Sequence, residues 1–97
     1  MIKVVIEKDK IDVKGHANYD EFGKDIVCAS VSTLVISTIN NIIDIDEESI
    51  LYEEKDNEIK IEIKKDNKIV RKLIDNMVLM LEDLEKDYPK NIKILRR

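Results

Sequence analysis

Apolar and polar positions alternate in two short segments of the chain, and three further segments are rich in residues that favour strands. Residues 2–7 are rich in β-branched side chains, and residues 11–15 and 59–64 alternate between apolar and polar positions. A period of two is typical of a strand that buries one face and exposes the other. Residues 49–54 and 92–95 have the same β-favouring composition. The pattern therefore predicts five strands.

Two longer segments repeat apolar residues at helical spacing. The first is predicted to begin at Asp25, because an Asp at the N-cap accepts hydrogen bonds from the unpaired backbone N–H groups of the first turn. The second covers roughly residues 68–86 and ends at Pro89. Ile36 and Ile43 lie off the apolar stripe of the first helix, so we expect this helix to be covered on more than one side. The two stripes comprise Val27, Val31, Leu34, Val35, Ile39 and Ile42, and Val70, Leu73, Ile74, Met77, Leu81 and Leu84.

The predicted order of elements is β-β-α-β-β-α-β. Hairpins joined by helices are typical of an α+β fold, in which two helices pack on one face of a mixed or antiparallel sheet. We therefore expect a two-layer sandwich of about five strands and two helices, forming a single domain over residues 1–97. The core of so short a chain is small, so pairing of two copies would add to its stability.

The charge of the chain argues against one large class of partners. Lys and Arg number 17 and Asp and Glu number 21, which gives a net charge of -4, whereas nucleic-acid-binding domains normally present a basic face. The uncharged run over residues 26–43 contains Ser, Thr and Asn, so we interpret it as a helix buried in protein rather than as a membrane span. With a single cysteine and no apolar leader in the first ten residues, the expected compartment is the cytoplasm.

The candidate chemistry is concentrated between residues 15 and 28. This stretch contains the only histidine, His16, the only cysteine, Cys28, and both glycines, Gly15 and Gly23. With Asp25 as N-cap, Cys28 falls at about the third helical position, where unpaired N–H groups stabilise a thiolate and lower the pKa of the thiol. A thiolate is a nucleophile, and a neighbouring His can protonate the leaving amine. The same N–H groups could stabilise the oxyanion that forms when the thiolate attacks a carbonyl.

Both glycines and Asp25 fit supporting roles in such a site. Gly15 permits a sharp turn of the chain and a close approach of substrate to the backbone. Gly23 could act as a hinge for a loop predicted over residues 17–24. Asp25 would oppose a nearby thiolate by its charge, so it helps only if it caps the helix or orients the histidine.

Each reactive residue also has a structural explanation. A lone Cys near an apolar run is more often a small core residue, and a lone His after a strand is usually a surface or turn residue. Ser32 follows Cys28 by four positions and shares its helical face, but Ser30 has a similar claim on sequence grounds. A metal site is less favoured still, because one His and one Cys would need two carboxylates to complete a zinc shell.

The same stretch resembles the motif of the Prp (YsxB-like) family of ribosomal-processing cysteine proteases. The family pattern is GHA, a variable loop, and then G-x-D-I-V-C-A-(small)-V-S, and the opening of the chain and its length also agree. The matching residues here are Gly15, His16, Ala17, Gly23, Asp25, Ile26, Val27, Cys28, Ala29, Val31 and Ser32.

The resemblance implies more than the residues alone. Members of the family are small α+β proteins that pair as homodimers. They are cytoplasmic endopeptidases that remove an N-terminal extension from a large-subunit ribosomal protein, the twenty-seventh. The cut follows an aromatic residue in an apolar motif. By this resemblance Cys28 is the nucleophile and His16 the general base and acid, with Asp25 and Ser32 nearby in supporting roles. The resemblance also implies an apolar groove near the loop, and it implies no metal and no organic cofactor. A non-catalytic ribosome-assembly partner that binds the same protein is the alternative.

Overall fold

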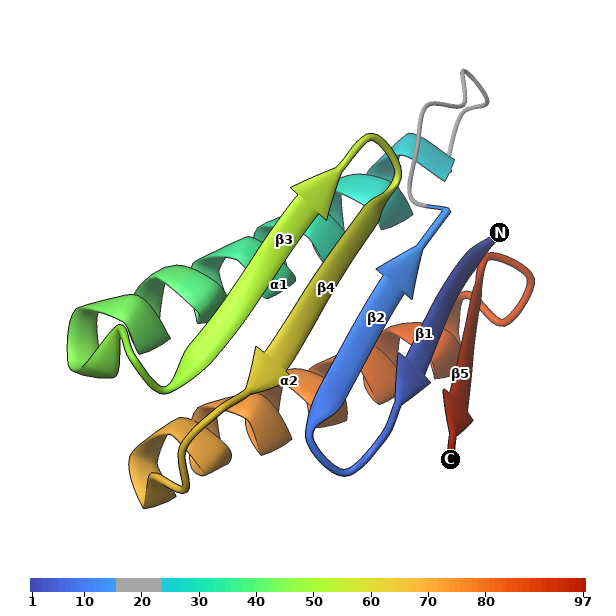
Figure 1. Cartoon of the computed structure of the whole chain (residues 1–97). Helices are drawn as coiled ribbons and strands as arrows, with labels where there is room; N and C mark the ends of the chain where they lie inside the picture. Colours follow the sequence, from blue (N-terminus) through green and yellow to red (C-terminus); the bar gives the residue numbers. More distant parts are fainter. Residues whose placement is uncertain (16–23) are drawn as a thin grey trace.

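The computed structural model describes residues 1–15 and 24–97 (Figure 1). The predicted order of the seven elements is confirmed. Each boundary that the pattern predicted lies within one residue of the observed one, and the end of the first helix, for which no position was predicted, is at Asp46. The elements are β1 Ile2–Ile6, β2 Lys10–Lys14, α1 Lys24–Asp46, β3 Ile50–Lys55, β4 Glu58–Ile63, α2 Lys68–Asp87 and β5 Ile92–Arg96.

The five strands form one mixed sheet in the order β3-β4-β2-β1-β5. Strands β1 and β5 are parallel, and the other neighbouring pairs are antiparallel. Both helices lie behind the same face of the sheet, and both β-α-β connections are right-handed, which is the hand that strand twist favours (Figure 1). The predicted two-layer α+β sandwich is therefore confirmed.

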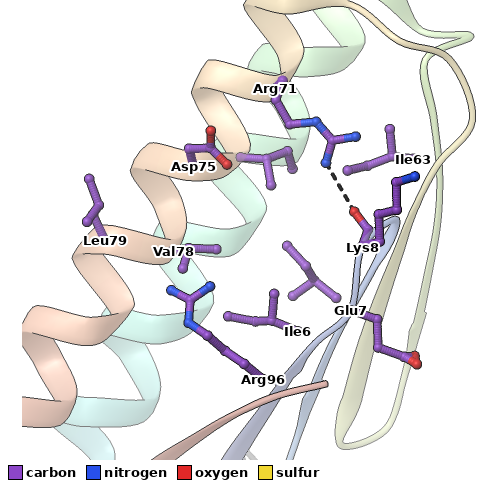
Figure 2. Close-up of a pocket in the computed structure, with 11 residues that line it drawn as sticks. Ile6, Glu7, Lys8, Ile63, Arg71, Asp75, Val78, Leu79 and Arg96 are labelled. Atoms are coloured by element: carbon purple, nitrogen blue, oxygen red, sulfur yellow. Dashed lines mark hydrogen bonds between the residues drawn. The ribbon is translucent and has the colours of Figure 1, made fainter.

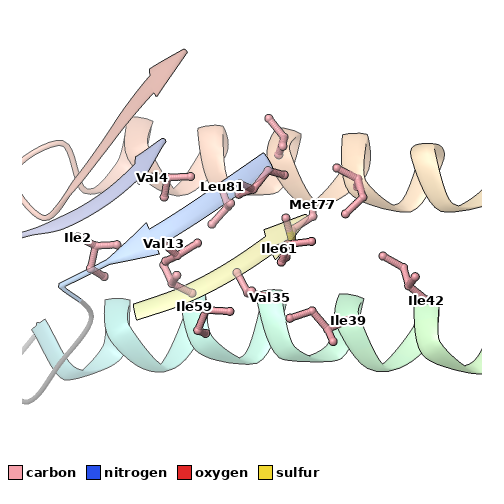
Figure 3. Close-up of a cluster of buried hydrophobic side chains, with 14 of the residues drawn as sticks. Ile2, Val4, Val13, Val35, Ile39, Ile42, Ile59, Ile61, Met77 and Leu81 are labelled. Carbon is pink, nitrogen blue, oxygen red and sulfur yellow. The ribbon is translucent and has the colours of Figure 1, made fainter. Parts of the chain in front are cut away.

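The core fills the space between the sheet and the two helices (Figure 3). Alternating strand residues such as Val4, Val13 and Ile61 point into it, as the period of two predicts. Both predicted helical stripes are confirmed: most of their residues are buried, and the three half-buried leucines pack against the core. The stripe on α2 is broader than predicted, because Val78 is also buried.

Helix α1 is long and apolar enough to cross a membrane by length and composition alone. One side of it is nevertheless built into the core, where Val31 and Val35 are fully buried, and it packs against α2 as well as the sheet. This arrangement is that of a core helix, and the expected cover on more than one side is confirmed. Of the two residues off the stripe, Ile43 packs against the core of its own chain and Ile36 is exposed.

Candidate active site

Gly15 directly follows β2 and adopts a backbone conformation that favours glycine. Its φ of +79° lies in the left-handed region, and a Cβ added to it would lie 2.6 Å from the carbonyl oxygen of Met1. The Gly15 N–H donates to the Asn57 carbonyl at 2.8 Å, which ties the end of β2 to the turn between β3 and β4. The turn-forming residues 55–58 were visible in the sequence, but no local pattern indicates that this turn contacts the end of β2.

Helix α1 begins at Lys24, so the predicted start at Asp25 and the predicted loop end at Lys24 are each wrong by one residue. Because Asp25 was predicted as the N-cap, the first fully helical residue lies two positions earlier than predicted. Asp25 is the second residue of the helix rather than its N-cap, and Cys28 is the fifth rather than the third. An acidic side chain stabilises a helix from any position in its first turn, so residue type alone did not identify the cap. In an α-helix that begins here, the unpaired N–H groups precede Cys28, whose own N–H faces the Lys24 carbonyl.

Cys28 lies at the boundary between the core and the surface. Its side chain is half-buried and packs against the core cluster, whereas the preceding Val27 is 1% exposed and Ile26 is 56% exposed. The thiol is therefore neither a fully buried core group nor a fully solvated one. His16, Gly23 and the predicted loop from residue 17 to residue 23 lie outside the described residues, so their parts in the site stay predictions.

The two candidate serines have different environments. The Ser30 hydroxyl donates to the Ile26 carbonyl one turn earlier, at 2.9 Å. Ser32 is half-buried one turn after Cys28, and its hydroxyl makes no hydrogen bond to any residue in the described part of the chain. A hydroxyl that bonds back to its own helix is already satisfied. Ser32 is therefore the better candidate of the two for contact with a thiolate or a substrate.

A cavity of about 430 Å³ lies at the far end of the sheet, beside the turn between β1 and β2 (Figure 2). Its apolar floor includes Ile6 and Ile63, and Arg71 of α2 closes one side by donating to the Lys8 carbonyl at 3.2 Å. Gly15 and the start of α1 are at the opposite end of the sheet (Figure 1). This cavity is therefore separate from the candidate site, and the expected apolar groove beside the loop stays a prediction.

A charged cluster lies on the face of the sheet away from the helices, close to the end of β2. Lys14 lies 3.6 Å from both Asp12 and Glu58. Burial raises the pKa of Asp12, and the adjacent Glu58 carboxylate raises this pKa further, while Lys14 and Lys60 lower it. Among the described residues, no group of three or more acidic, His or Cys side chains is placed to hold a metal ion. His16 is not among them, so the expected absence of a metal stays a prediction.

The family model for the cysteine protease Prp matches residues 1–93. The chain belongs to the Prp family of cysteine proteases. It is 31% identical over 93 residues to the ribosomal processing cysteine protease Prp of Bacillus subtilis, covering 86% of this chain and 80% of that protein. It is 30% identical over 83 residues to the protein of the same name from Staphylococcus aureus strain Mu50, covering 82% of this chain and 78% of that one. The resemblance noted in the motif and the expected enzyme class are thereby confirmed.

Solved structures agree with this assignment over the whole fold. The crystal structure of the ribosomal processing protease Prp from S. aureus in complex with a substrate peptide matches with a TM-score of 0.93 at 25% identity, covering 100% of both chains. The S. aureus protein in complex with a covalently linked product peptide matches with a TM-score of 0.89 at 26% identity, again covering 100% of both chains. The protein SMU.848 from Streptococcus mutans matches with a TM-score of 0.77 at 26% identity, covering 99% of this chain and 93% of that one.

Proposed function

We propose that this Prp-family protease removes the N-terminal extension of a large-subunit ribosomal protein, the twenty-seventh, with Cys28 as the nucleophile and His16 as the general base and acid. The observation that carries the proposal is the half-buried Cys28 near the start of α1, in a fold that matches a Prp protein holding a covalently linked product peptide. The names of the relatives, which are ribosomal processing proteases, support the substrate class.

In the first half of the proposed reaction, His16 takes the proton of the Cys28 thiol and the sulfur attacks the scissile carbonyl. The tetrahedral oxyanion forms beside the first turn of α1, where unpaired N–H groups and the helix dipole favour negative charge. The carbon–nitrogen bond then breaks as the protonated His16 delivers its proton to the leaving amine. A thioester between Cys28 and the N-terminal fragment remains.

In the second half, His16 removes a proton from a water molecule that attacks the thioester. The carbon–sulfur bond breaks, the fragment leaves with a new carboxyl group, and Cys28 regains its proton from His16. In this proposal the Ser32 hydroxyl, one turn after Cys28, donates a hydrogen bond near the sulfur. The half-buried position of Cys28 suits both halves, because the sulfur must reach the substrate while part of its surface is kept from water.

The deciding experiment is cleavage of a peptide that carries the ribosomal protein's N-terminal extension, followed by mass spectrometry. The parent protein should release two fragments, and Cys28→Ala should cut below about one thousandth of the parent rate, because no other group of the reaction can replace the nucleophile. Ser30→Ala is the matched control, since its hydroxyl is bonded to its own helix, and it should retain parent activity. Equal rates for the parent and Cys28→Ala would contradict the mechanism.

The alternative, a ribosome-assembly partner that binds the extended protein without cutting it, predicts a different result. It requires the parent protein to bind the same peptide and leave its mass unchanged. Labelling with iodoacetamide at about pH 6 adds a second criterion, because a thiol held as thiolate near that pH reacts fast. Cleavage together with fast labelling of Cys28 supports the protease, and binding with neither supports the alternative.

The cellular setting belongs to the same proposal. A protease that acts during ribosome assembly works in the cytoplasm, where a lone thiol stays reduced. The net charge of -4 suits a basic ribosomal protein as substrate and gives no support for direct binding of nucleic acid. We further propose a homodimer, since the core of a 97-residue chain is small. The apolar residues off the stripe of α1, Ile36 and Ile43, make this helix the candidate dimer face from sequence. Of the two, Ile36 is the better candidate for contact with a second copy, because Ile43 is partly buried against the core of its own chain.

A further inference from the structure

Strand β3 is an edge of the sheet, and its backbone alternates between bonding to β4 and facing outward. The Lys64 N–H donates to the Ser49 carbonyl at 2.7 Å, immediately before the paired residues of β3 and β4. In an antiparallel ladder every second residue bonds to the partner strand. The N–H and C=O groups of Ile50, Tyr52 and Glu54 therefore face away from β4. No segment in the described part of the chain provides a hydrogen bond to them.

The opposite edge of the sheet, formed by β5, is treated differently. The outward-facing N–H of Ile94 donates to a carboxylate oxygen of Glu85 on α2 at 2.9 Å. Proteins commonly block exposed edges in this way, because unpaired N–H and C=O groups invite another strand. One edge of this sheet is thus partly closed by its own helix, and the β3 edge is left available for pairing.

The open edge carries exposed apolar side chains. Leu51 is 56% exposed and Tyr52 is 51% exposed. Tyr52 lies opposite Ile61, a residue that points into the core, so its ring is on the same face of the sheet as the helices. A strand added along this edge would therefore meet an aromatic ring beside α1, which contacts β3.

The edge leads toward the nucleophile. Strand β3 runs to the β3–β4 turn, which lies at the same end of the sheet as the start of α1 (Figure 1). Helix α1 packs against α2 on one flank. With the sheet in front of a right-handed α-helix and right-handed crossover, the row formed by Cys28 and Ser32 lies on the other flank, beside β3. An extended chain paired with the outer edge of β3 would run along the same side of the molecule as this row.

The charge around the edge indicates what kind of strand fits. Between residues 44 and 58 the sequence has eight Asp and Glu residues and a single Lys. Glu53, Glu54 and Asp56, on β3 and its turn, are exposed. Like charges repel when the same edge of a second copy approaches, whereas a basic peptide is attracted. A protein that binds ribosomal RNA is basic, so charge favours the proposed substrate over a second copy of this chain.

We propose that the basic substrate binds as an added strand along the open edge of β3, with its backbone paired to Ile50, Tyr52 and Glu54 and its scissile bond directed to Cys28. This inference rests on the proposed function and names the surface that positions the substrate. Main-chain pairing supplies affinity in such an arrangement, and pockets for alternate side chains supply specificity. Tyr52 and Glu54 are positioning residues in this proposal, and neither takes part in the chemistry.

The first test measures binding separately from cleavage. Fluorescent peptides that span the processed region, each with one amide N-methylated, are titrated into the Cys28→Ala protein and followed by anisotropy. An N-methyl group that replaces a pairing N–H should raise Kd about tenfold, and the next position along should change it little, so the effect should alternate with a period of two. Loss of affinity without alternation, or no loss at any position, would overturn the proposal even if the parent protein cleaves the peptide.

The second test changes the edge itself. Tyr52→Pro removes an outward N–H and leaves the ladder to β4 intact, so the fold should tolerate it. It should weaken peptide binding and raise KM about tenfold while kcat stays near the parent value, because the chemistry is untouched. Tyr52→Ala keeps the backbone N–H and removes the ring, so it shows how much of the effect of Tyr52→Pro comes from loss of the ring alone. Arg96→Pro is the matched control on the β5 edge, where N–H groups two residues apart face the same way as that of Ile94.

The outcomes are distinguishable. Parent-like binding by a folded Tyr52→Pro would exclude pairing at this edge. A change from dimer to monomer in Tyr52→Pro would assign the edge to self-association and also overturn the proposal. If Tyr52→Pro does not fold, the N-methyl series still decides, since it needs no change to β3. Absence of cleavage by the parent protein would contradict the proposed function alone, because alternating affinity in the Cys28→Ala protein would still support the edge.

Discussion

The backbone at Gly15 adopts a left-handed conformation, and a Cβ built on this residue would lie 2.6 Å from the Met1 carbonyl oxygen. This one residue directs the chain from the end of β2 into the segment that carries His16. Its N–H, bonded to the Asn57 carbonyl, fixes that departure point against the β3–β4 turn. The direction in which the chain leaves β2 thus depends on a residue that has no side chain to take part in the chemistry.

We predict that Gly15→Ala destabilises the protein. The left-handed φ and the 2.6 Å approach to Met1 together should cost about 2 kcal/mol or more, because backbone would have to shift. For a chain of this size, the loss corresponds to a fall in Tm of about 10 °C. Thermal unfolding followed by circular dichroism measures it, and Lys3→Ala, at an exposed strand position, is the control. An unchanged Tm for Gly15→Ala would show that the turn relaxes freely.

At the scale of elements, the end of α1 is joined to the start of α2 by one carboxylate. Asp46 accepts from Lys65 at 3.1 Å and from the Asn67 side-chain amide at 3.3 Å. Asn67 is in turn the N-cap of α2, since its side-chain oxygen accepts from the N–H groups of Ile69 and Val70. The hydrogen bond from Lys65 is the main cause that lowers the pKa of Asp46, and partial burial opposes it.

We predict that this carboxylate makes folding sensitive to acid. A carboxyl group whose pKa is lower in the folded state stabilises the fold above its unfolded pKa, and this contribution is lost as the pH falls. Urea unfolding of the parent between pH 6 and pH 3 should therefore lose stability most steeply below about pH 4. Asp46→Asn should be less stable near neutral pH and show a shallower decline. Asp44→Asn, at an exposed position on the same helix, is the control. If its stability declines with falling pH as little as that of Asp46→Asn, the acid sensitivity does not come from Asp46.

At the scale of the whole molecule, a 97-residue α+β sandwich has little interior. Several large apolar side chains remain exposed on it, among them Ile36 of α1. These residues are available for contact with another protein surface, although single exposed apolar side chains are common in monomers too.

We predict that sedimentation velocity gives a particle of twice the 11.3 kDa chain mass. A second copy would cover apolar surface that a core of this size leaves exposed. Ile36→Glu should shift the particle toward the monomer, since burial of a charge opposes association. Asn76→Glu, at an exposed position on α2, tests whether any added charge has this effect. A parent protein that sediments as a monomer would exclude the dimer.

The sequence by itself determined the order of strands and helices, their bounds to within one residue except for the end of α1, the buried stripes and the motif that identifies the family. These features depend on local periodicity and on residue type, which are readable along the chain. The start of α1 was wrong by one residue, because Asp stabilises more than one position of the first turn.

Only the tertiary structure decided that Ile43 is partly buried against the core, that Ser30 is bonded to its own helix while Ser32 is not, and that β3 rather than β5 has an open edge. Each depends on which segments, distant in sequence, become neighbours in space. Local patterns of hydrophobicity do not specify the order of strands in the sheet or which flank of a helix faces outward. The surface proposed to hold the substrate therefore became visible only once the sheet was assembled.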